Sequence, residues 1–289
     1  MKKILSFLLC VALLCTTLFA LSSCGDKDIK IAIPNDPTNC ARALLLLEAQ
    51  GLIELDDEAG ITATVRDITS NPYNIKFVEM EAAQIPRALV DVDYAVINSN
   101  YAIEADLNPV EDSIAIEGSA AAYANILCVR EGNENDPKIL ALKAALASEQ
   151  VKNFIIEKYD GAVVPVVENT TDGYDASIDY EALADADTKI TVAASPTPHA
   201  EILEIAKEIL ATKGITLVIE VYNDYIVPNQ IVDQEQKDAN YFQHVPYLDD
   251  FNAQNGTHIV SVLAVHNEPM GIYSNEYDSF DAIKNNANK

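Results

Sequence analysis

The sequence has little cysteine, and this shortage excludes two kinds of protein. Of its five cysteines, Cys10, Cys15 and Cys24 lie in or directly after an apolar leader. Only Cys40 and Cys128 remain, both in apolar surroundings, which argues against a disulfide-stapled domain and for buried thiols. Sequence alone leaves open whether these two pair. No cysteine–histidine spacing suits zinc, so we expect no metal site.

Glycine and basic residues are also scarce. The chain has ten glycines, and it lacks a phosphate-cradling glycine loop, a Gly-x-Ser-x-Gly elbow and a zinc-protease motif. We therefore expect neither an enzyme nor a cofactor. Lys and Arg number 19 against 45 Asp and Glu, for a net charge of −26. Such a charge argues against nucleic acid and anionic lipid as partners, although it is equally compatible with a role in solubility alone.

The first residues predict a lipid-anchored protein. Two lysines precede the uncharged apolar run 4–21, and Leu21-Ser22-Ser23-Cys24 follows. This is typical of a secretory signal peptide, and the cysteine directly after small residues looks like a lipobox. The run is about long enough for a transmembrane helix, which is the alternative. We expect cleavage before Cys24, acylation of its thiol (palmitate) and attachment to the extracytoplasmic face of the cell membrane.

Strand and helix periodicities alternate along the rest of the chain, and this alternation predicts an α/β fold with mainly parallel sheets. Ligands in such folds bind at the carboxyl ends of strands. An acidic stretch without apolar period, 168–189, is interpreted as a linker. The predicted strands are 29–34, 75–79, 94–97, 124–130, 190–194, 217–221, 259–266 and 271–274. The predicted helices are 38–50, 82–90, 137–147, 149–159, 198–212, 225–233, 245–255 and 279–286.

Several motifs together resemble the NlpA/MetQ family of methionine-binding lipoproteins, and they cover nearly all of the chain after the leader. They are Ile33-Pro34-Asn35-Asp36-Pro37-Thr38-Asn39, Glu81-Ala82-Ala83-Gln84-Ile85-Pro86-Arg87, Val96-Ile97-Asn98, Tyr123-Ala124-Asn125, Pro198-His199-Ala200-Glu201, Asp238-Ala239-Asn240-Tyr241-Phe242-Gln243-His244 and His266-Asn267-Glu268-Pro269-Met270-Gly271.

The resemblance implies a two-lobed, periplasmic-binding-protein-like (type II) fold. It also implies a circular permutation, because the family places the segment like 190–287 before the segment like 29–167. A remnant of a tandem duplication would give the same order. The sequence also leaves open whether the permuted chain is a functional monomer or a dimer that has swapped halves. The expected divisions are a signal peptide 1–23, a lipidated tether 24–28, a first lobe 29–116 completed by 278–289, a second lobe 117–167 and 190–277 with the hinge crossings, and the linker 168–189.

The resemblance also implies a ligand site. Arg42 lies in the first turn of a predicted helix, where free amides and a guanidinium fork suit a carboxylate. A surface ion pair is the alternative. Asn98 and Asn125 match ligand-binding positions of the family and offer both a donor and an acceptor. Tyr241 and Phe242 are candidate walls for a thioether, or ordinary core residues. His266 is a candidate ligand contact or a structural histidine.

We expect a binding protein that captures methionine, or a close derivative, between its lobes and delivers it to an ABC importer of permease and ATPase. The sequence does not separate L-methionine, D-methionine and a methionine dipeptide. One alternative is a lipid-anchored surface protein that keeps the fold but has lost transport. Another is the binding of a different small amino acid or dipeptide.

Overall fold

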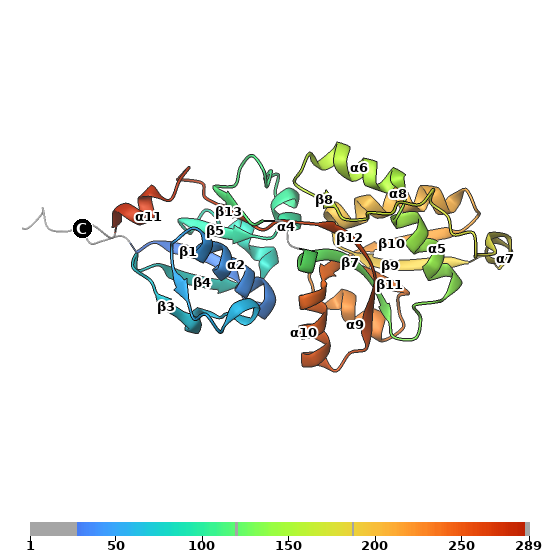
Figure 1. Ribbon diagram of the computed structural model, residues 1–289, viewed down its shortest axis with the longest axis horizontal. Coiled ribbons are helices and arrows are strands. Elements are labelled where there is room, and N and C mark those ends of the chain that lie inside the picture. Colours follow the sequence, from blue (N-terminus) through green and yellow to red (C-terminus); the bar gives the residue numbers. More distant parts are fainter. Residues whose placement is uncertain (1–27, 119–120, 187, 287–289) are drawn as a thin grey trace, which may run out of the picture.

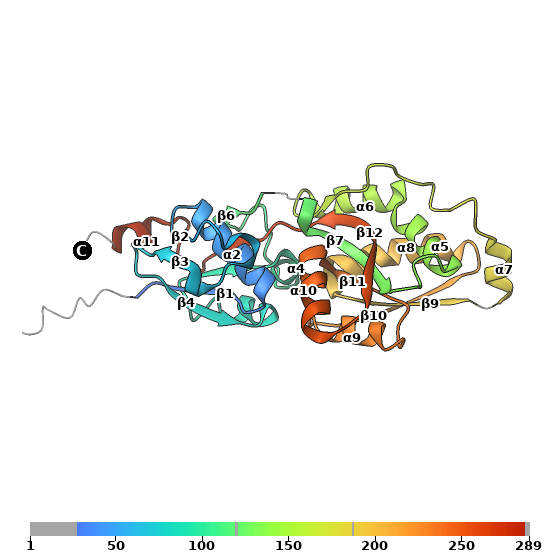
Figure 2. The same ribbon diagram turned by 60° about the horizontal axis from the view of Figure 1, so that its bottom comes forward.

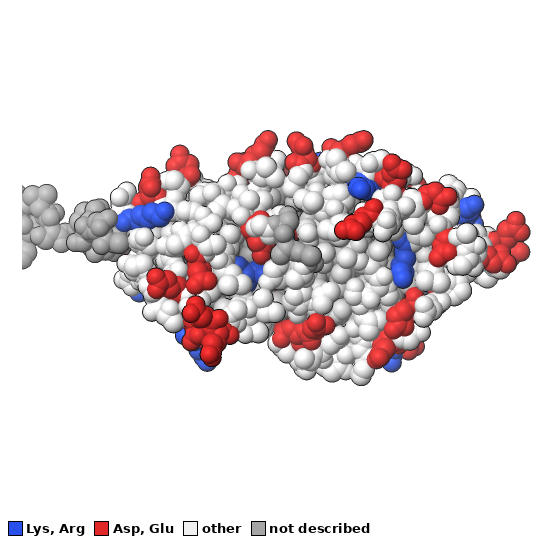
Figure 3. Space-filling model, in the orientation of Figure 1, with Lys and Arg blue, Asp and Glu red and all other residues white. Residues whose placement is uncertain are grey.

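Two separate β-sheets divide the chain into two lobes (Figure 1). The computed structural model describes residues 28–118, 121–186 and 188–286. The predicted signal peptide, its cleavage site and the acceptor Cys24 lie outside these residues. Carboxylates far outnumber basic side chains over the visible face, as Figure 3 shows.

The first lobe contains a five-stranded sheet in the order β4–β1–β5–β13–β6. β1 pairs in parallel with β4 and β5, while β13 is antiparallel to both β5 and β6. A small two-stranded sheet, β2–β3, lies beside it. The strands are β1 (Lys30–Pro34), β2 (Glu54–Leu55), β3 (Ile68–Ser70), β4 (Lys76–Met80), β5 (Tyr94–Ile97), β6 (Ala115–Ile116) and β13 (Gly271–Tyr273). The helices are α2 (Pro37–Ala49), α3 (Ile85–Ala88), α4 (Ser99–Glu104) and α11 (Asp281–Asn286), with short turns η2 (Gly60–Thr62), η3 (Val65–Asp67) and η4 (Ala82–Gln84).

The second lobe contains a six-stranded sheet in the order β10–β9–β11–β7–β12–β8. Its parallel half, β10–β9–β11, meets an antiparallel half at β7. The strands are β7 (Ala124–Arg130), β8 (Val164–Pro165), β9 (Lys189–Ala194), β10 (Thr216–Val221), β11 (Ala239–His244) and β12 (Ile259–Asn267). The helical segments are η5 (Ala121–Tyr123), α5 (Pro137–Leu146), α6 (Glu149–Tyr159), α7 (Tyr180–Asp185), η6 (Pro196–Ala200), α8 (Glu201–Ala211), α9 (Val227–Asp233) and α10 (Val245–Asn255).

The prediction of two α/β lobes is therefore confirmed. The lobes are joined by two stretches of chain, one between β6 and β7 and one between β12 and β13 (Figures 1 and 2). The exchanged order of the halves stays a prediction, because the fold by itself does not record the order in which relatives connect these elements.

The tail of the chain belongs to the first lobe. Ile283 on α11 is fully buried in its core, and the Tyr94 hydroxyl donates to the Ser279 carbonyl at 2.9 Å. The expected second lobe, 190–277, needs a correction here. Its last strand, β13, lies between β5 and β6 of the first sheet. Periodicity identifies a strand but not its partners, and β13 is separated from β12 by only 268–270.

The linker 168–189 is more ordered than its composition indicated. It contains the helix α7, whose N-cap Asp179 accepts a hydrogen bond from the Ala182 amide at 3.0 Å. Tyr174, Tyr180 and Leu183 pack against the core of the second lobe. Gly173 has φ +98° and lies so close to Ile209 that a Cβ there would come within 2.8 Å of it. The linker is thus held against α8 by a few apolar anchors spaced too irregularly to give a period.

Strand β11 was missed by the sequence reasoning, although it lies inside the larger sheet. Its polar residues Asn240 and Gln243 interrupt the apolar pattern that marks a buried strand. Both are buried, and both hydrogen-bond to Asn229 of α9. Pairing removes most of the cost of burying these amides, so a polar strand is stable in the centre of the lobe.

Candidate functional site

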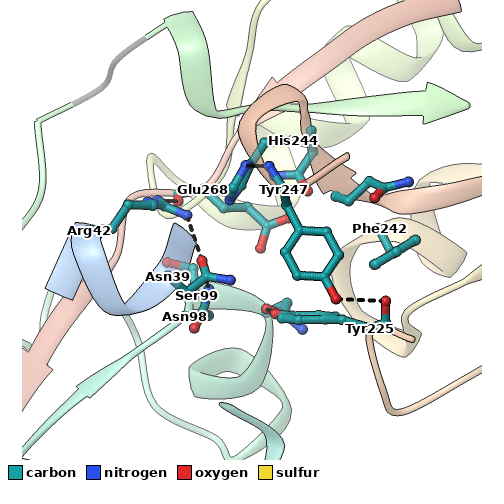
Figure 4. A pocket seen from close by; sticks show the side chains of 12 residues that line it. Asn39, Arg42, Asn98, Ser99, Tyr225, Phe242, His244, Tyr247 and Glu268 are labelled. Atoms are coloured by element: carbon teal, nitrogen blue, oxygen red, sulfur yellow. Dashed lines mark hydrogen bonds between the residues drawn. The ribbon is translucent and has the colours of Figure 1, made fainter. Parts of the chain in front are cut away.

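A narrow pocket lies between the two lobes, bounded by groups from both (Figure 4). Its unfilled space, mouth included, is about 340 Å³, and the Tyr225 hydroxyl of the second lobe donates across it to Oδ1 of Asn100 in the first lobe at 2.6 Å. The lobes are therefore closed on each other. The lining residues are Asn39, Arg42, Asn98, Ser99, Asn100, Asn125, Tyr225, Phe242, Gln243, His244, Tyr247 and Glu268.

The first lobe brings amide and guanidinium groups to this pocket. Asn39 and Arg42 lie three residues apart at the start of α2, so they share one face of the helix. The Asp36 carboxylate caps this helix by accepting from the Asn39 amide at 2.9 Å. Asn98 follows the carboxyl end of the parallel strand β5, which is where ligands bind in such sheets.

Arg42 holds together the two stretches that join the lobes. Its Nε donates to Oε1 of Glu117 at 3.2 Å, and its Nη2 donates to Oε2 at 2.5 Å. Nη2 also donates to the Glu268 carbonyl at 3.2 Å, and Nη1 donates to Oδ1 of Asn39 at 3.3 Å. The ring of Tyr123 lies 4.4 Å from the guanidinium carbon.

These contacts correct one expectation about Arg42. Its fork is not free to grip a ligand carboxylate with two parallel bonds, because Glu117 already occupies it. Of the five N–H groups of arginine, one on Nη1 has no partner among the described residues. Arg42 is 4 % exposed, so the simple surface ion pair is also excluded. Glu117 lies 75 positions away in sequence, and local spacing gave no sign of it.

Asn98 is held so that its carbonyl oxygen is unpaired. Its Nδ2 donates to Oδ1 of Asn39 at 2.9 Å. Its Oδ1 is buried and has no hydrogen-bond partner among the described residues. A buried acceptor left unpaired costs about 1–3 kcal/mol, so this oxygen favours a ligand that brings a donor.

The second lobe contributes an aromatic wall. Tyr225 and Phe242 have ring centroids 5.7 Å apart, and Tyr225 and Tyr247 have centroids 5.8 Å apart. The Tyr247 hydroxyl donates to the Tyr225 carbonyl at 3.0 Å (Figure 4). His244 begins α10, and its Nδ1 caps that helix by accepting from the Tyr247 amide at 3.2 Å. Burial and the nearby Arg42 hold the pKa of His244 far below its usual range.

Glu268 is the carboxylate of the pocket, and two histidines support it from behind. Oε1 of Glu268 lies 2.6 Å from Nε2 of His266 and 3.2 Å from Nε2 of His199. Burial alone would raise the pKa of Glu268, but the hydrogen bond with His266 and the charge of Arg42 act in the opposite direction, and that pKa lies below its usual value. Glu268 is therefore an anion inside the closed pocket.

His199 is neutral and fixes the orientation of Asn125. Burial lowers the pKa of His199 to about 3. Its Nδ1 is buried and has no partner in the part of the chain that the structure describes, so the single N–H belongs on Nε2, which lies 3.0 Å from Oδ1 of Asn125. With its oxygen so engaged, Asn125 has only N–H groups left to offer to a ligand.

The ligand atoms of His199, His266 and Glu268 all lie within 4.8 Å of one another, and these residue types bind transition metals. The hydrogen bonds described above account for the cluster without an ion. In addition, a metal-bound histidine normally donates its second ring nitrogen to an acceptor, and Nδ1 of His199 has none among the described residues.

Four of the six predicted ligand residues line the pocket: Arg42, Asn98, Asn125 and Phe242. Tyr241 and His266 do not. They are fully buried behind the wall, and the Tyr241 hydroxyl is hydrogen-bonded to Nδ1 of His266. On β11, Phe242 lines the pocket while Tyr241 belongs to the core of the second lobe, and the pairing register with β7 is irregular between Tyr241 and Gln243.

Sequence reasoning did not select eight lining residues. Two carried a usable signal: Asn39 lies one helical turn before Arg42, and Glu268 is the only carboxylate in the His266–Gly271 motif. The remainder lie on elements whose inner faces the sequence does not mark. They are Ser99, Asn100, Tyr225, Gln243, His244 and Tyr247.

The chain matches curated proteins, solved structures and a protein-family model. The chain is 47% identical over 134 residues to the membrane lipoprotein TpN32 of Treponema pallidum, covering 46% of this chain and 50% of that protein. It is 40% identical over 137 residues to the D-methionine-binding lipoprotein MetQ of Escherichia coli, covering 47% of this chain and 51% of that protein. The chain thus spans about half the length of the curated relatives it matches.

Among solved structures, a nutrient-binding protein from Burkholderia cenocepacia bound to methionine shares 47% identity with a TM-score of 0.46, over 47% of this chain and 58% of that one. Lipoprotein Tp32 from Treponema pallidum shares 46% identity with a TM-score of 0.45, over 46% and 56% respectively. No helix in the described ranges has both the length and the apolar character needed to cross a bilayer. A family model described as NlpA lipoprotein matches residues 20–167 and 190–288, so the chain belongs to the NlpA lipoprotein family.

Proposed function

We propose that the chain captures a free amino acid, with methionine as the first candidate, between its lobes and delivers it to an ABC importer. The observation that carries this proposal is the sorting of groups around one closed pocket. Among the described residues, Oδ1 of Asn98 is an acceptor without a partner, the carboxylate of Glu268 lies beside it, Arg42 and Asn125 bring N–H groups, and an aromatic wall completes the lining. A zwitterion with an apolar side chain complements all three.

The carboxylate end of the ligand is recognised by N–H groups. Arg42 offers one N–H on Nη1, and Asn125 offers its amide N–H groups because His199 occupies its oxygen. The positive charge of Arg42 is largely balanced by Glu117. Arg42 therefore serves as much to hold the binding groups in place as to attract the ligand.

The ammonium end is recognised by Oδ1 of Asn98 and by the carboxylate of Glu268. Asn98 belongs to the first lobe, while Glu268 lies on the stretch that joins β12 to β13. An ammonium that bonds to both links the lobes in the closed arrangement. Hydrogen bonds to a charged group contribute roughly 1.5–3 kcal/mol each, which is enough for one residue to dominate the affinity.

The ligand side chain lies against Tyr225, Phe242 and Tyr247. Sulfur–aromatic contacts contribute about 0.3–1.5 kcal/mol, so a thioether suits this wall. Because residues of both lobes line the pocket, the ligand enters when the lobes part and is enclosed when they close. The two stretches between the lobes are the natural hinge. Binding and release require no chemistry on the ligand.

The comparisons support methionine as the first candidate. Matched relatives are named D-methionine-binding lipoproteins, and one matched structure is described as bound to methionine. Since the matches span only about half of those proteins, the ligand, the importer and the lipid anchor on Cys24 are proposals for this chain. L-methionine, D-methionine and a methionine dipeptide present the same carboxylate, and the experiment below separates them.

Isothermal titration of the purified chain with L-methionine, D-methionine, glycyl-methionine and a panel of other amino acids tests the proposal. We expect saturable binding of at least one methionine compound. Asn98→Leu should weaken it at least tenfold, while Asn153→Leu on the exposed face of α6 should leave it unchanged. Binding of another amino acid alone would replace methionine as the ligand, and no binding of any would reject the proposal.

The alternative of a surface protein without transport is separated by a second measurement. Reconstituted importer should hydrolyse ATP faster when the ligand-loaded chain is added. Ligand binding without any such stimulation would favour the surface protein.

A further inference from the structure

The aromatic end of the pocket contains one polar side chain that the proposed function does not use. Asn100 lies on α4, is 3 % exposed and lines the pocket together with Tyr225, Phe242 and Tyr247. Its neighbours at this end are large apolar rings. An amide placed among them is costly unless both its carbonyl and its NH₂ find partners.

Only half of the Asn100 amide is paired. The Tyr225 hydroxyl donates to its Oδ1 at 2.6 Å. Tyr225 is itself fixed, since its ring lies 5.1 Å from that of Tyr101 and its carbonyl accepts from Tyr247. Nδ2 of Asn100 is buried and has no hydrogen-bond partner among the described residues. The pocket therefore has a free donor beside the wall where the ligand side chain lies.

A free donor at this place discriminates between ligands. More than nine in ten buried polar groups in native proteins are paired, with protein or with water. A ligand that displaces water from Nδ2 without replacing its hydrogen bond loses affinity, and a ligand that supplies an acceptor gains it. A thioether sulfur is only a weak acceptor. The side chain of methionine therefore packs well against the aromatic wall but leaves Nδ2 of Asn100 without a good hydrogen-bond acceptor.

We propose that Asn100 is a specificity-determining residue that selects amino acids whose side chain carries an uncharged acceptor oxygen near its end. This rests on the proposed function of the pocket as an amino-acid site. Methionine sulfoxide fits best: it adds one acceptor oxygen to methionine and no donor. Glutamine fits less well, because its own NH₂ would face the aromatic wall without a partner. A carboxylate side chain is disfavoured by the anionic Glu268 nearby.

Titration calorimetry with L-methionine and L-methionine sulfoxide tests this. We expect the wild-type chain to bind the sulfoxide at least tenfold more tightly. Asn100→Leu, which removes the donor and keeps the approximate volume, should abolish that preference, and Asn153→Leu should retain it. Thermal unfolding of each variant checks that it is folded. Should Asn100→Leu not fold, Asn100→Ala, which also removes the donor and introduces no larger side chain, takes its place and should likewise abolish the preference.

Two results would overturn the proposal. One is wild-type binding of methionine that equals or exceeds that of the sulfoxide, which leaves the proposed function standing. The other is a preference for the sulfoxide that survives in Asn100→Leu, which places the selection elsewhere. Failure of both ligands to bind would reject the methionine site itself as well.

Discussion

The two lobes contribute to the pocket in different ways. The first lobe supplies amides and a guanidinium from the starts of α2 and α4, beside the carboxyl ends of its parallel strands. The second lobe supplies rings from β11, α10 and the segment before α9, together with the amide of Asn125 at the start of β7. The aromatic wall lies on one side only while polar groups come from both, so neither lobe alone makes a site. Closure brings the two together, and Arg42 lies where the connecting stretches meet.

The comparison of the two lobes predicts that removing the Arg42 side chain has the largest effect on stability, because Arg42 joins both connecting stretches to the first lobe. Arg42→Met should lower the free energy of unfolding by about 3–5 kcal/mol, since Glu117 keeps the hydrogen bond from the Met270 amide but is left as a mostly buried charge without its counter-ion. Lys207→Met breaks an exposed pair with Glu204 and should cost less than ~1 kcal/mol. Urea denaturation of both variants measures the difference. Equal losses would show that Arg42 does not join the stretches.

The first lobe depends on a segment from the far end of the chain, and the second lobe does not. Ile283→Ala on α11 should cost about 2–4 kcal/mol, because it opens a cavity in the core of the first lobe. The exposed Ile156→Ala on α6 should change stability by less than ~0.5 kcal/mol. Calorimetric unfolding measures both. A negligible loss for Ile283→Ala would mean that the first lobe is complete without its tail.

Lowering the pH should destabilise the second lobe through its buried histidines. The pKa of His199 is about 3 in the folded chain and roughly 6.5 when unfolded. The unfolded state therefore takes up the proton first, and stability falls as the pH drops below ~6.5. His244 acts in the same direction. From pH 7 to 5 the loss due to His199 is about 2 kcal/mol.

Urea unfolding at a series of pH values measures this loss. His199→Gln should flatten the slope between pH 7 and 5, whereas His258→Gln, at a largely exposed side chain, should leave it unchanged. Glu268 adds stability that is present above its unfolded pKa and lost only at lower pH, as its depressed folded pKa requires. A slope that His199→Gln does not alter would contradict the assignment of His199 as neutral and buried.

The two faces of β11 give the smallest predicted difference. Tyr241→Phe removes the hydrogen bond to His266 and should cost about 1 kcal/mol of stability without changing ligand affinity. Phe242→Ala should instead weaken binding, because it removes part of the aromatic wall. Titration calorimetry and urea denaturation of both variants measure the two effects. A loss of ligand affinity in Tyr241→Phe would show that Tyr241 contributes to the binding site after all.

The alternation of strands and helices and two residues of the first lobe's binding face, Arg42 and Asn98, could be predicted from the sequence. Asn39 and Arg42 are local features of one helix start, and Asn98 follows directly after a buried strand. The roles of Tyr241 and His266 could not be predicted. Tyr241 is aromatic, His266 is polar, and both lie in motifs that resemble the family, so their residue types are compatible with a binding role. The register of β11 and β12 decides which side chains face the pocket.

The sequence by itself determined that strands and helices alternate and that most of the chain belongs to one family, because periodicity and motifs are local properties. Tertiary structure alone decided that Glu117 occupies the fork of Arg42, that β13 and α11 complete the first lobe, and that Asn98 and Asn100 each present one unpaired atom to the pocket. These facts depend on groups far apart in the chain, and only close packing of the two lobes brings such groups within hydrogen-bonding distance.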